Sequence, residues 1–170
     1  ATVFSGIGSI EWALKRLNIL HEIVFACDSG ERYLKEDFES INKDMEGLDH
    51  YQIKKYIDNI YDRTGKKNFV QESYMNNYEI NPENFYQDIR FLDGTFYRGE
   101  VDLFVGGSPC QSFSISGYRA GLEDARGTLF YDYARLVKEL QPKVFIYENV
   151  PGMLSHDKGN TFKIISEIFD

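Results

Sequence analysis

The chain has 170 residues, of which 42% are hydrophobic, and this composition predicts one soluble globular domain and excludes a disordered chain. Two isolated cysteines and the lack of any apolar run long enough to cross a bilayer exclude disulfide-stabilised and membrane-spanning classes and favour the cytoplasm. The net charge of −8 excludes the broadly basic footprint of most nucleic-acid binders, so a phosphate-binding surface would have to be local or lie outside these residues.

The first half of the sequence predicts strands that alternate with helices. Apolar runs and helical periodicities indicate a strand at 1–4, a glycine turn at 5–9, a helix from Ile10 to Leu17, a strand at 22–27 and the beginning of a helix at 32–40.

The pattern loosens between about residues 41 and 84. Only residues 51–61 show helical periodicity there, the pair Asn76-Asn77 indicates a loop, and acidic side chains outnumber basic ones. We interpret this stretch as an insertion in the surface of the domain, not as a phosphate-binding arm.

The second half continues the alternation of strands and helices. It predicts strands at 85–89, 101–105 and 144–147 and helices at 129–140 and from Phe162 onwards. Strands alternating with helices form a mostly parallel sheet with right-handed crossovers, which predicts an α/β fold. The sequence begins within a strand and ends within a helix, so we expect a fragment or split polypeptide, truncated at the carboxyl side.

Polar residues or glycines follow each of the five predicted strands. They are the Gly6/Gly8 turn, Asp28, Asp88, Pro109-Cys110 and Glu148-Asn149. Because ligands bind at the carboxyl edge of open parallel sheets, this edge is expected to carry the active site.

Cys110 and Glu148 are the candidate catalytic pair. Cys110 follows a strand on a loop of small, polar residues, which favours an accessible nucleophile over a buried structural cysteine. Glu148 could protonate or hydrogen-bond a ring nitrogen of a substrate. The alternative, a surface carboxylate, is weakened because the apolar strand 144–147 is expected to be buried.

The glycine turn after the first strand is the candidate cofactor site. Glu11 stands where a dinucleotide fingerprint has its third glycine, near the expected pyrophosphate, so a cofactor without phosphates such as S-adenosylmethionine fits better. Asp28 could accept hydrogen bonds from a ribose diol or cap a helix, and both alternatives stay open. Asp88 could bind an exocyclic amine or, more simply, cap a turn.

Four motifs together resemble those of the cytosine-C5 DNA methyltransferases, in the same order. They are FSGIG at 4–8, PCQ at 109–111, RGTLF at 126–130 and ENV at 148–150. The resemblance covers residues 1–35 and 85–170. It implies the Rossmann-like fold of S-adenosylmethionine-dependent methyltransferases and a bacterial restriction-modification enzyme. Such an enzyme methylates C5 of a flipped cytosine in double-stranded DNA through a covalent cysteine adduct.

The resemblance also implies roles for single residues. Cys110 would be the nucleophile and Glu148 the partner of cytosine N3, while Phe4 would stack on adenine and Asp28 would hold the ribose. The other implied cofactor-binding residues are Ser5, Gly6, Gly8, Asp88, Ile89, Pro109 and Leu129. The residues implied to lie near the flipped nucleotide are Gln111, Ser114, Ser116, Arg126 and Asn149, and no metal site is implied.

Two departures from the family pattern qualify the expected activity. The stretch between Asp28 and Asp88 is longer than in compact family members, and the target-recognition domain is absent from these residues. DNA methylation is therefore expected to need a further carboxyl-terminal part, in cis or as a second chain. A tRNA cytosine-C5 methyltransferase and a non-catalytic methyltransferase-like domain remain alternatives, the latter disfavoured by the presence of both Cys110 and Glu148.

Overall fold

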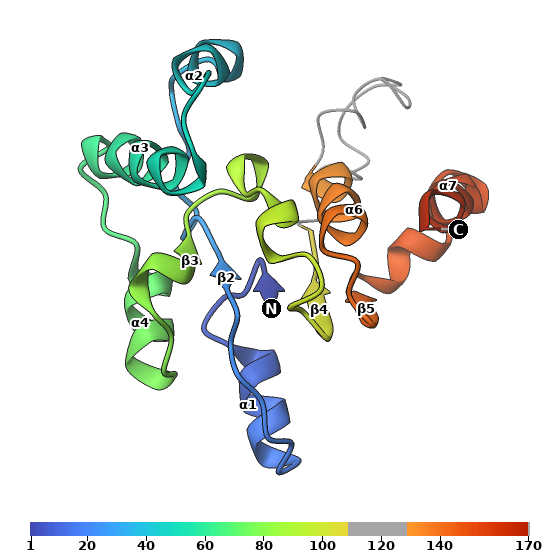
Figure 1. Ribbon diagram of the computed structural model, residues 1–170. Coiled ribbons are helices and arrows are strands. Elements are labelled where there is room, and N and C mark those ends of the chain that lie inside the picture. Colours follow the sequence, from blue (N-terminus) through green and yellow to red (C-terminus); the bar gives the residue numbers. More distant parts are fainter. Residues whose placement is uncertain (109–128, 170) are drawn as a thin grey trace.

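A computed structural model describes residues 1–108 and 129–169, and its centre is a parallel β-sheet (Figure 1). The strands are β1 (Thr2–Val3), β2 (Ala26–Cys27), β3 (Phe85–Tyr86), β4 (Leu103–Gly106) and β5 (Val144–Tyr147). Their order is β3-β2-β1-β4-β5, and every neighbouring pair is parallel. The predicted α/β fold with a mostly parallel sheet is confirmed.

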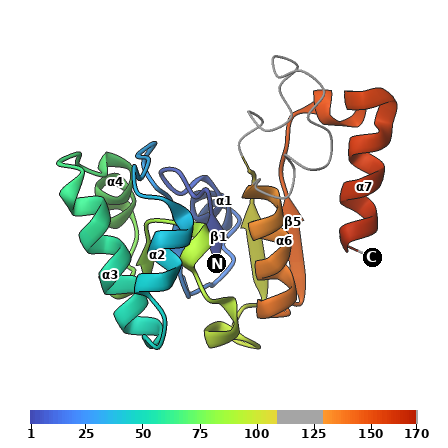
Figure 2. The same ribbon diagram turned by 90° about the horizontal axis from the view of Figure 1, so that it is seen from above.

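Helices cover both faces of this sheet (Figure 1). They are α1 (Ser9–Arg16), α2 (Phe38–Asp44), α3 (His50–Arg63), α4 (Phe69–Asn77), α6 (Leu129–Leu140) and α7 (Asn160–Phe169). Short 3-10 turns lie at Pro82–Asn84, Ile89–Phe91, Gly94–Tyr97, Pro151–Leu154 and His156–Gly159. Figure 2 shows α2, α3 and α4 gathered on the β3 side of the sheet and α6 and α7 on the β5 side. No helix of the described residues is long and apolar enough to span a membrane.

Alternation along the strands sends neighbouring side chains into two separate cores. Val3, Cys27 and Tyr86 point to the face that α6 covers, where they pack with Tyr133 and Leu136.

The opposite face carries the side chains that alternate with these. Ala26 and Phe85 pack there against Tyr74 of α4. Thr2 donates a hydrogen bond from its hydroxyl to buried Glu11 of α1 (2.8 Å). Figure 1 accordingly shows α3 and α6 on one side of the sheet and α1 and α4 on the other.

The five strands end in one row across the sheet. Val3 is in register with Cys27 and with Gly106, Cys27 with Tyr86, and Gly106 with Tyr147. Each of these residues is the last of its strand. The loops that follow therefore start at the same level, and the polar residues predicted there lie along one edge.

The helix expected to begin at residue 32 starts only at Phe38. Gly30 and Glu31 both adopt left-handed backbone conformations, with φ of 63° and 57°, which breaks the helical path. Arg32 is buried, and its Nε–H donates to the carbonyl of Ser29 (2.9 Å). The irregular segment 29–36 is thereby held against the domain instead of forming a helix.

Two further expectations differ from the structure. Residues 69–77 form helix α4, which the sequence did not predict, and its last two residues, Asn76-Asn77, had indicated a loop. Tyr74 is the one buried side chain of α4, so the sequence shows no helical periodicity there. Strand β5 is not buried within the described residues: Val144 is 55% and Ile146 49% exposed. β5 pairs only with β4 and forms the edge of the sheet.

Candidate functional site

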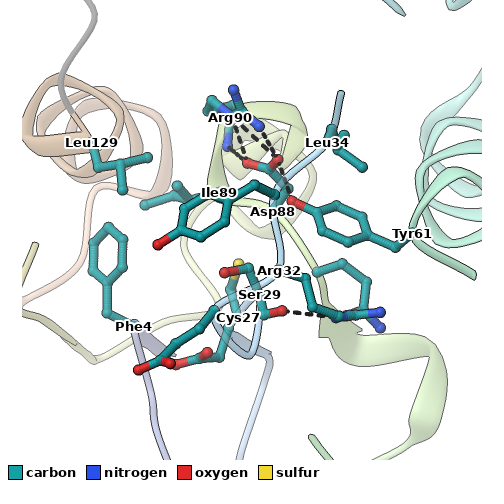
Figure 3. A pocket seen from close by; sticks show the side chains of 14 residues that line it. Phe4, Cys27, Ser29, Arg32, Leu34, Tyr61, Asp88, Ile89, Arg90 and Leu129 are labelled. Atoms are coloured by element: carbon teal, nitrogen blue, oxygen red, sulfur yellow. Dashed lines mark hydrogen bonds and ion pairs between the residues drawn. The ribbon is translucent and has the colours of Figure 1, made fainter. Parts of the chain in front are cut away.

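A cavity of about 420 Å³ opens at the carboxyl edge of the sheet (Figure 3). Its volume is in the range of small-molecule and cofactor sites. Predicted cofactor residues from four separate segments line it, namely Phe4, Asp28, Asp88, Ile89 and Leu129. Ser5, Gly6 and Gly8 do not line it, and Pro109, Cys110, Gln111, Ser114, Ser116 and Arg126 lie outside the described residues.

Apolar side chains form one wall of this cavity. Phe4, in a left-handed conformation with φ of 53°, lies across from Leu129 at the start of α6, with Ile89 beside them (Figure 3). A slot between an aromatic ring and branched aliphatic side chains suits a flat, apolar group.

Asp28 is fixed by backbone donors from two loops. Its Oδ2 accepts from the Gly6 N–H (2.9 Å) and its Oδ1 from the Gly30 N–H (2.8 Å). A carboxylate offers about four acceptor positions, so Asp28 keeps capacity for further donors. The alternative of a helix cap is wrong, because no helix follows Asp28 within residues 29–37.

Asp88 caps the 3-10 turn Ile89–Phe91, as the simpler interpretation predicted. Its Oδ1 accepts from the Arg90 N–H (3.0 Å), and the Arg90 guanidinium pairs with Oδ2 (2.6 Å). The Tyr61 hydroxyl also donates to Oδ2 (2.8 Å). Asp88 therefore faces the cavity as a carboxylate already held by two neighbours.

Glu11 does not face this cavity, contrary to the expectation. Its carboxylate is buried, and Oε1 accepts from the hydroxyls of Thr2 and Tyr74 (2.8 and 2.7 Å). Glu11 joins α1 to β1 and to α4 on one face of the sheet, and it does not line the cavity at the sheet edge.

Glu148 lies at the end of β5, next to the start of the segment that leads to Cys110. Its N–H donates to the carbonyl of Gly106 (2.9 Å), which extends the β4–β5 pairing by one residue. A Cβ on Gly107 would stand 2.6 Å from Glu148 Oε2, so the carboxylate folds over the bare backbone of Gly107.

Hydrogen bonds tie this segment to β5. The hydroxyls of Ser108 and Tyr147 lie 2.6 Å apart, and the side-chain amide of Asn149 donates to Tyr147 Oη (3.0 Å). Asn149 and Tyr147 therefore hold Ser108, in the segment that follows β4. Sequence reasoning missed Ser108 and Tyr147, although both directly precede predicted site residues.

Comparison with known proteins identifies the family. Residues 47–170 match the family model described as C-5 cytosine-specific DNA methylase. The chain belongs to this family.

Two phage methyltransferases align with almost the whole chain. The orphan methyltransferase M.Rho11sI of Bacillus phage rho11s is 38% identical over 99% of this chain and 26% of its own length. M.SPRI of Bacillus phage SPR, also an orphan methyltransferase, is 36% identical over 99% of this chain and 30% of its own length. The Type II methyltransferase M.Eco47II of Escherichia coli is 51% identical over 48% of this chain and 19% of its own length. The chain thus spans less than a third of the length of each of these relatives.

A buried arginine that no motif indicated supports the cavity wall. Arg32 donates to the carbonyls of Ser29 (2.9 Å) and Lys66 (3.3 Å) and to the side-chain oxygen of Gln87, and it stacks over the Tyr61 ring at 4.8 Å. Burial lowers the pKa of Arg32.

The two cavity-lining guanidinium groups, those of Arg32 and Arg90, thus have partners within the protein, which favours a ligand without phosphates. Among the described residues, no cluster of His, Cys, Asp or Glu could hold a metal ion.

Proposed function

We propose that the protein containing this chain is an S-adenosylmethionine-dependent DNA cytosine-C5 methyltransferase. The observation that carries the proposal is the cavity where Phe4, Asp28 and Leu129 meet, at the same sheet edge as Glu148. Family membership supports the reaction type. The names of the relatives support a place in bacterial or phage DNA modification, as an orphan or a restriction-modification enzyme, and hence action in the cytoplasm.

The apolar side chains and carboxylate acceptors that line the cavity suit S-adenosylmethionine. Phe4, Ile89 and Leu129 would hold the adenine by its faces, Asp88 would lie at the adenine edge, and Asp28 would accept from the ribose hydroxyls. The loop of Ser5, Gly6 and Gly8 would hold the amino-acid end. When bound, S-adenosylmethionine supplies an electrophilic methyl group.

The catalytic chemistry of the chain itself rests on Cys110 and Glu148. Cytosine C5 is too weak a nucleophile to be methylated directly, so the Cys110 thiolate would add to C6 and make C5 electron-rich. Glu148 would hold a proton at N3, where negative charge develops during the addition, a type of help that contributes about 10²–10⁴-fold. Loss of the C5 proton would later expel Cys110.

The substrate cytosine has to leave the DNA stack for this attack, at a cost of a few kcal/mol. Gln111, Ser114, Ser116 and Arg126 would contact the flipped nucleotide or its surroundings, and Asn149 would orient the strand ends beside Glu148. A target-recognition part outside this chain, in cis or as a second chain, would supply sequence specificity.

Replacement of the nucleophile tests the proposal. Cys110→Ser in the intact protein is expected to abolish transfer of labelled methyl groups to DNA and to leave S-adenosylmethionine binding nearly unchanged, since Phe4, Asp28 and Asp88, which are proposed to hold the cofactor, follow other strands. Parallel assays with DNA and tRNA under single-turnover conditions identify the substrate. Substantial methylation by Cys110→Ser would remove the nucleophile assignment, and methylation of tRNA alone would favour the RNA-modifying alternative.

A further inference from the structure

Residues 41–84, which the sequence indicated as an insertion, contact the loops around the cofactor cavity. Three side chains of this segment, Tyr61, Asn68 and Tyr78, each donate a hydrogen bond to one of three cofactor loops. We propose that Tyr61, Asn68 and Tyr78 are positioning residues for the cofactor site. This inference rests on the proposed function, since it assigns the segment to the same site.

Tyr61, in the last turn of α3, supports Asp88. Its hydroxyl donates to Asp88 Oδ2 over 2.8 Å, between residues 27 positions apart in the sequence. Tyr61 is only 2% exposed, and burial together with Asp88 raises the pKa of its hydroxyl, which therefore stays a donor at physiological pH. The contact fixes one oxygen of the carboxylate that lines the adenine side of the cavity.

Asn68 holds the main chain of the Asp28 loop. Its amide Nδ2 donates to the main-chain carbonyl of Asp28 (3.0 Å) and to the side-chain oxygen of Gln87 (2.8 Å). Its Oδ1 caps α4 by accepting from the Gln71 N–H (3.0 Å). One buried amide thus joins the start of α4 to the loops after β2 and β3.

Tyr78 supports the glycine turn. Its hydroxyl donates to the carbonyl of Gly8 (2.6 Å) across 70 positions of sequence. Gly8 has φ of 88°, and a Cβ there would overlap the Tyr78 ring. The glycine is therefore required by contact with Tyr78 as well as by its backbone conformation.

These contacts predict a specific pattern of effects. Each one holds a loop atom beside the cofactor cavity, and none involves Glu148 or the segment that leads to Cys110. Loosening them should weaken cofactor binding while the chemistry on cytosine, measured at saturating cofactor, changes little. A role in packing alone would instead lower the stability of the protein and leave cofactor affinity unchanged.

Tyr61→Phe in the intact protein tests the inference against a matched control. Tyr56→Phe removes another tyrosine hydroxyl from α3, one that donates to Asp44 (2.7 Å) away from the cavity. Isothermal titration with S-adenosylhomocysteine is expected to show about fivefold weaker binding for Tyr61→Phe, since one hydrogen bond to a carboxylate is lost, and unchanged binding for Tyr56→Phe. The KM for S-adenosylmethionine should rise in parallel, at a kcat close to the unmutated value.

A second variant guards against a folding defect. Asn68→Ser retains an acceptor that caps α4 but removes both amide donors, so it should also weaken S-adenosylhomocysteine binding. Melting temperatures of the ligand-free proteins report folding separately. If Asp28→Ala weakens binding while Tyr61→Phe and Asn68→Ser bind as tightly as the unmutated protein, the inference is overturned and the proposed function stands. If the unmutated protein does not bind S-adenosylhomocysteine, both are overturned.

Discussion

Glu148 occupies its position because Gly107, across from it at the end of β4, has no side chain. The Glu148 carboxylate lies where a Cβ of Gly107 would otherwise stand. Its main chain is fixed by the hydrogen bond to Gly106, so the side chain starts from a defined point at the sheet edge. In the proposed role at cytosine N3, the carboxyl group of Glu148 would extend from this fixed main-chain position.

We therefore predict that Glu148→Gln lowers the chemical rate more than tenfold. The amide keeps the size and a hydrogen-bond donor but cannot deliver the proton that N3 needs. Trapping of the covalent complex with a 5-fluorocytosine oligonucleotide measures this step. Glu167→Gln, which alters an exposed glutamate paired with Lys163 on α7, serves as a control and should trap at the unmutated rate. Equal trapping rates for Glu148→Gln and the unmutated protein would contradict the assignment.

Local sequence signals predicted Asp28 and Asp88 at the cavity, the family resemblance implied Phe4 and Ile89, and both missed the residues that support the cavity from distant positions in the sequence. Phe4 and Asp28 stand directly after strands and Ile89 follows β3 by three residues, so parallel topology brings them together. Tyr61 contacts Asp88, 27 positions away in the sequence, and Asn68 contacts Asp28, 40 positions away. Both contacts depend on how α3 and α4 pack. No periodicity or motif encodes such contacts.

At the scale of elements, α3 is joined to the sheet through a polar aromatic cluster. A capping box of Asp49 and Gln52 starts α3, and His50 follows at its first turn. His50 Nε2 lies 2.6 Å from the Tyr86 hydroxyl of β3, and its ring stacks on Phe96 at 3.9 Å. Burial lowers the pKa of His50 below its ordinary value of 6.5.

This lowered pKa predicts loss of stability in mild acid. The unfolded chain takes up a proton near pH 6.5, and the folded chain does so only at lower pH. The contribution of neutral His50 is therefore complete above about pH 6.5 and is lost as the pH falls below that value. Urea denaturation at several pH values should show a smaller loss of stability in acid for His50→Phe than for the unmutated protein. Identical pH dependence in the two proteins would show that His50 does not titrate in this way.

The elements themselves were predictable to different degrees. Helix α6 was expected because Tyr133, Leu136 and Leu140 recur at helical spacing, and these side chains are buried. Most of the strands are shorter than the apolar runs that predicted them. β2 starts only at Ala26, although the Phe25 carbonyl already accepts from the Thr2 N–H (3.2 Å), and Asp88 caps a turn two residues after β3. Apolar runs indicate burial, while the length of a strand depends on the neighbours with which it pairs.

At the scale of the whole molecule, the charge distribution limits what this chain does with DNA. The net charge is −8, and no basic cluster is larger than a pair; two of these pairs are Lys54-Lys55 and Lys66-Lys67. One member of each pair is neutralised by a carboxylate: Lys54 binds Asp58 (2.6 Å), and Lys67 binds Glu72 (2.8 Å). Over the whole sequence, 27 acidic side chains outnumber 19 basic ones, so the chain has no excess of cations to hold phosphates.

We therefore predict that the 170-residue chain alone binds duplex DNA weakly and does not methylate it at a useful rate. Each phosphate neutralised by a protein cation contributes about −0.9 to the slope of log K against log salt, so a chain with an excess of carboxylates and no large basic cluster should show a shallow slope. Fluorescence titrations of a labelled duplex at low and moderate salt measure affinity and slope together. Replacement of the other lysine of each pair, Lys55→Gln with Lys66→Gln, should barely change either quantity. Tight binding with a steep salt dependence, or sequence-specific methylation by these 170 residues, would contradict the prediction, because it would require a phosphate-binding surface that the charge distribution does not provide.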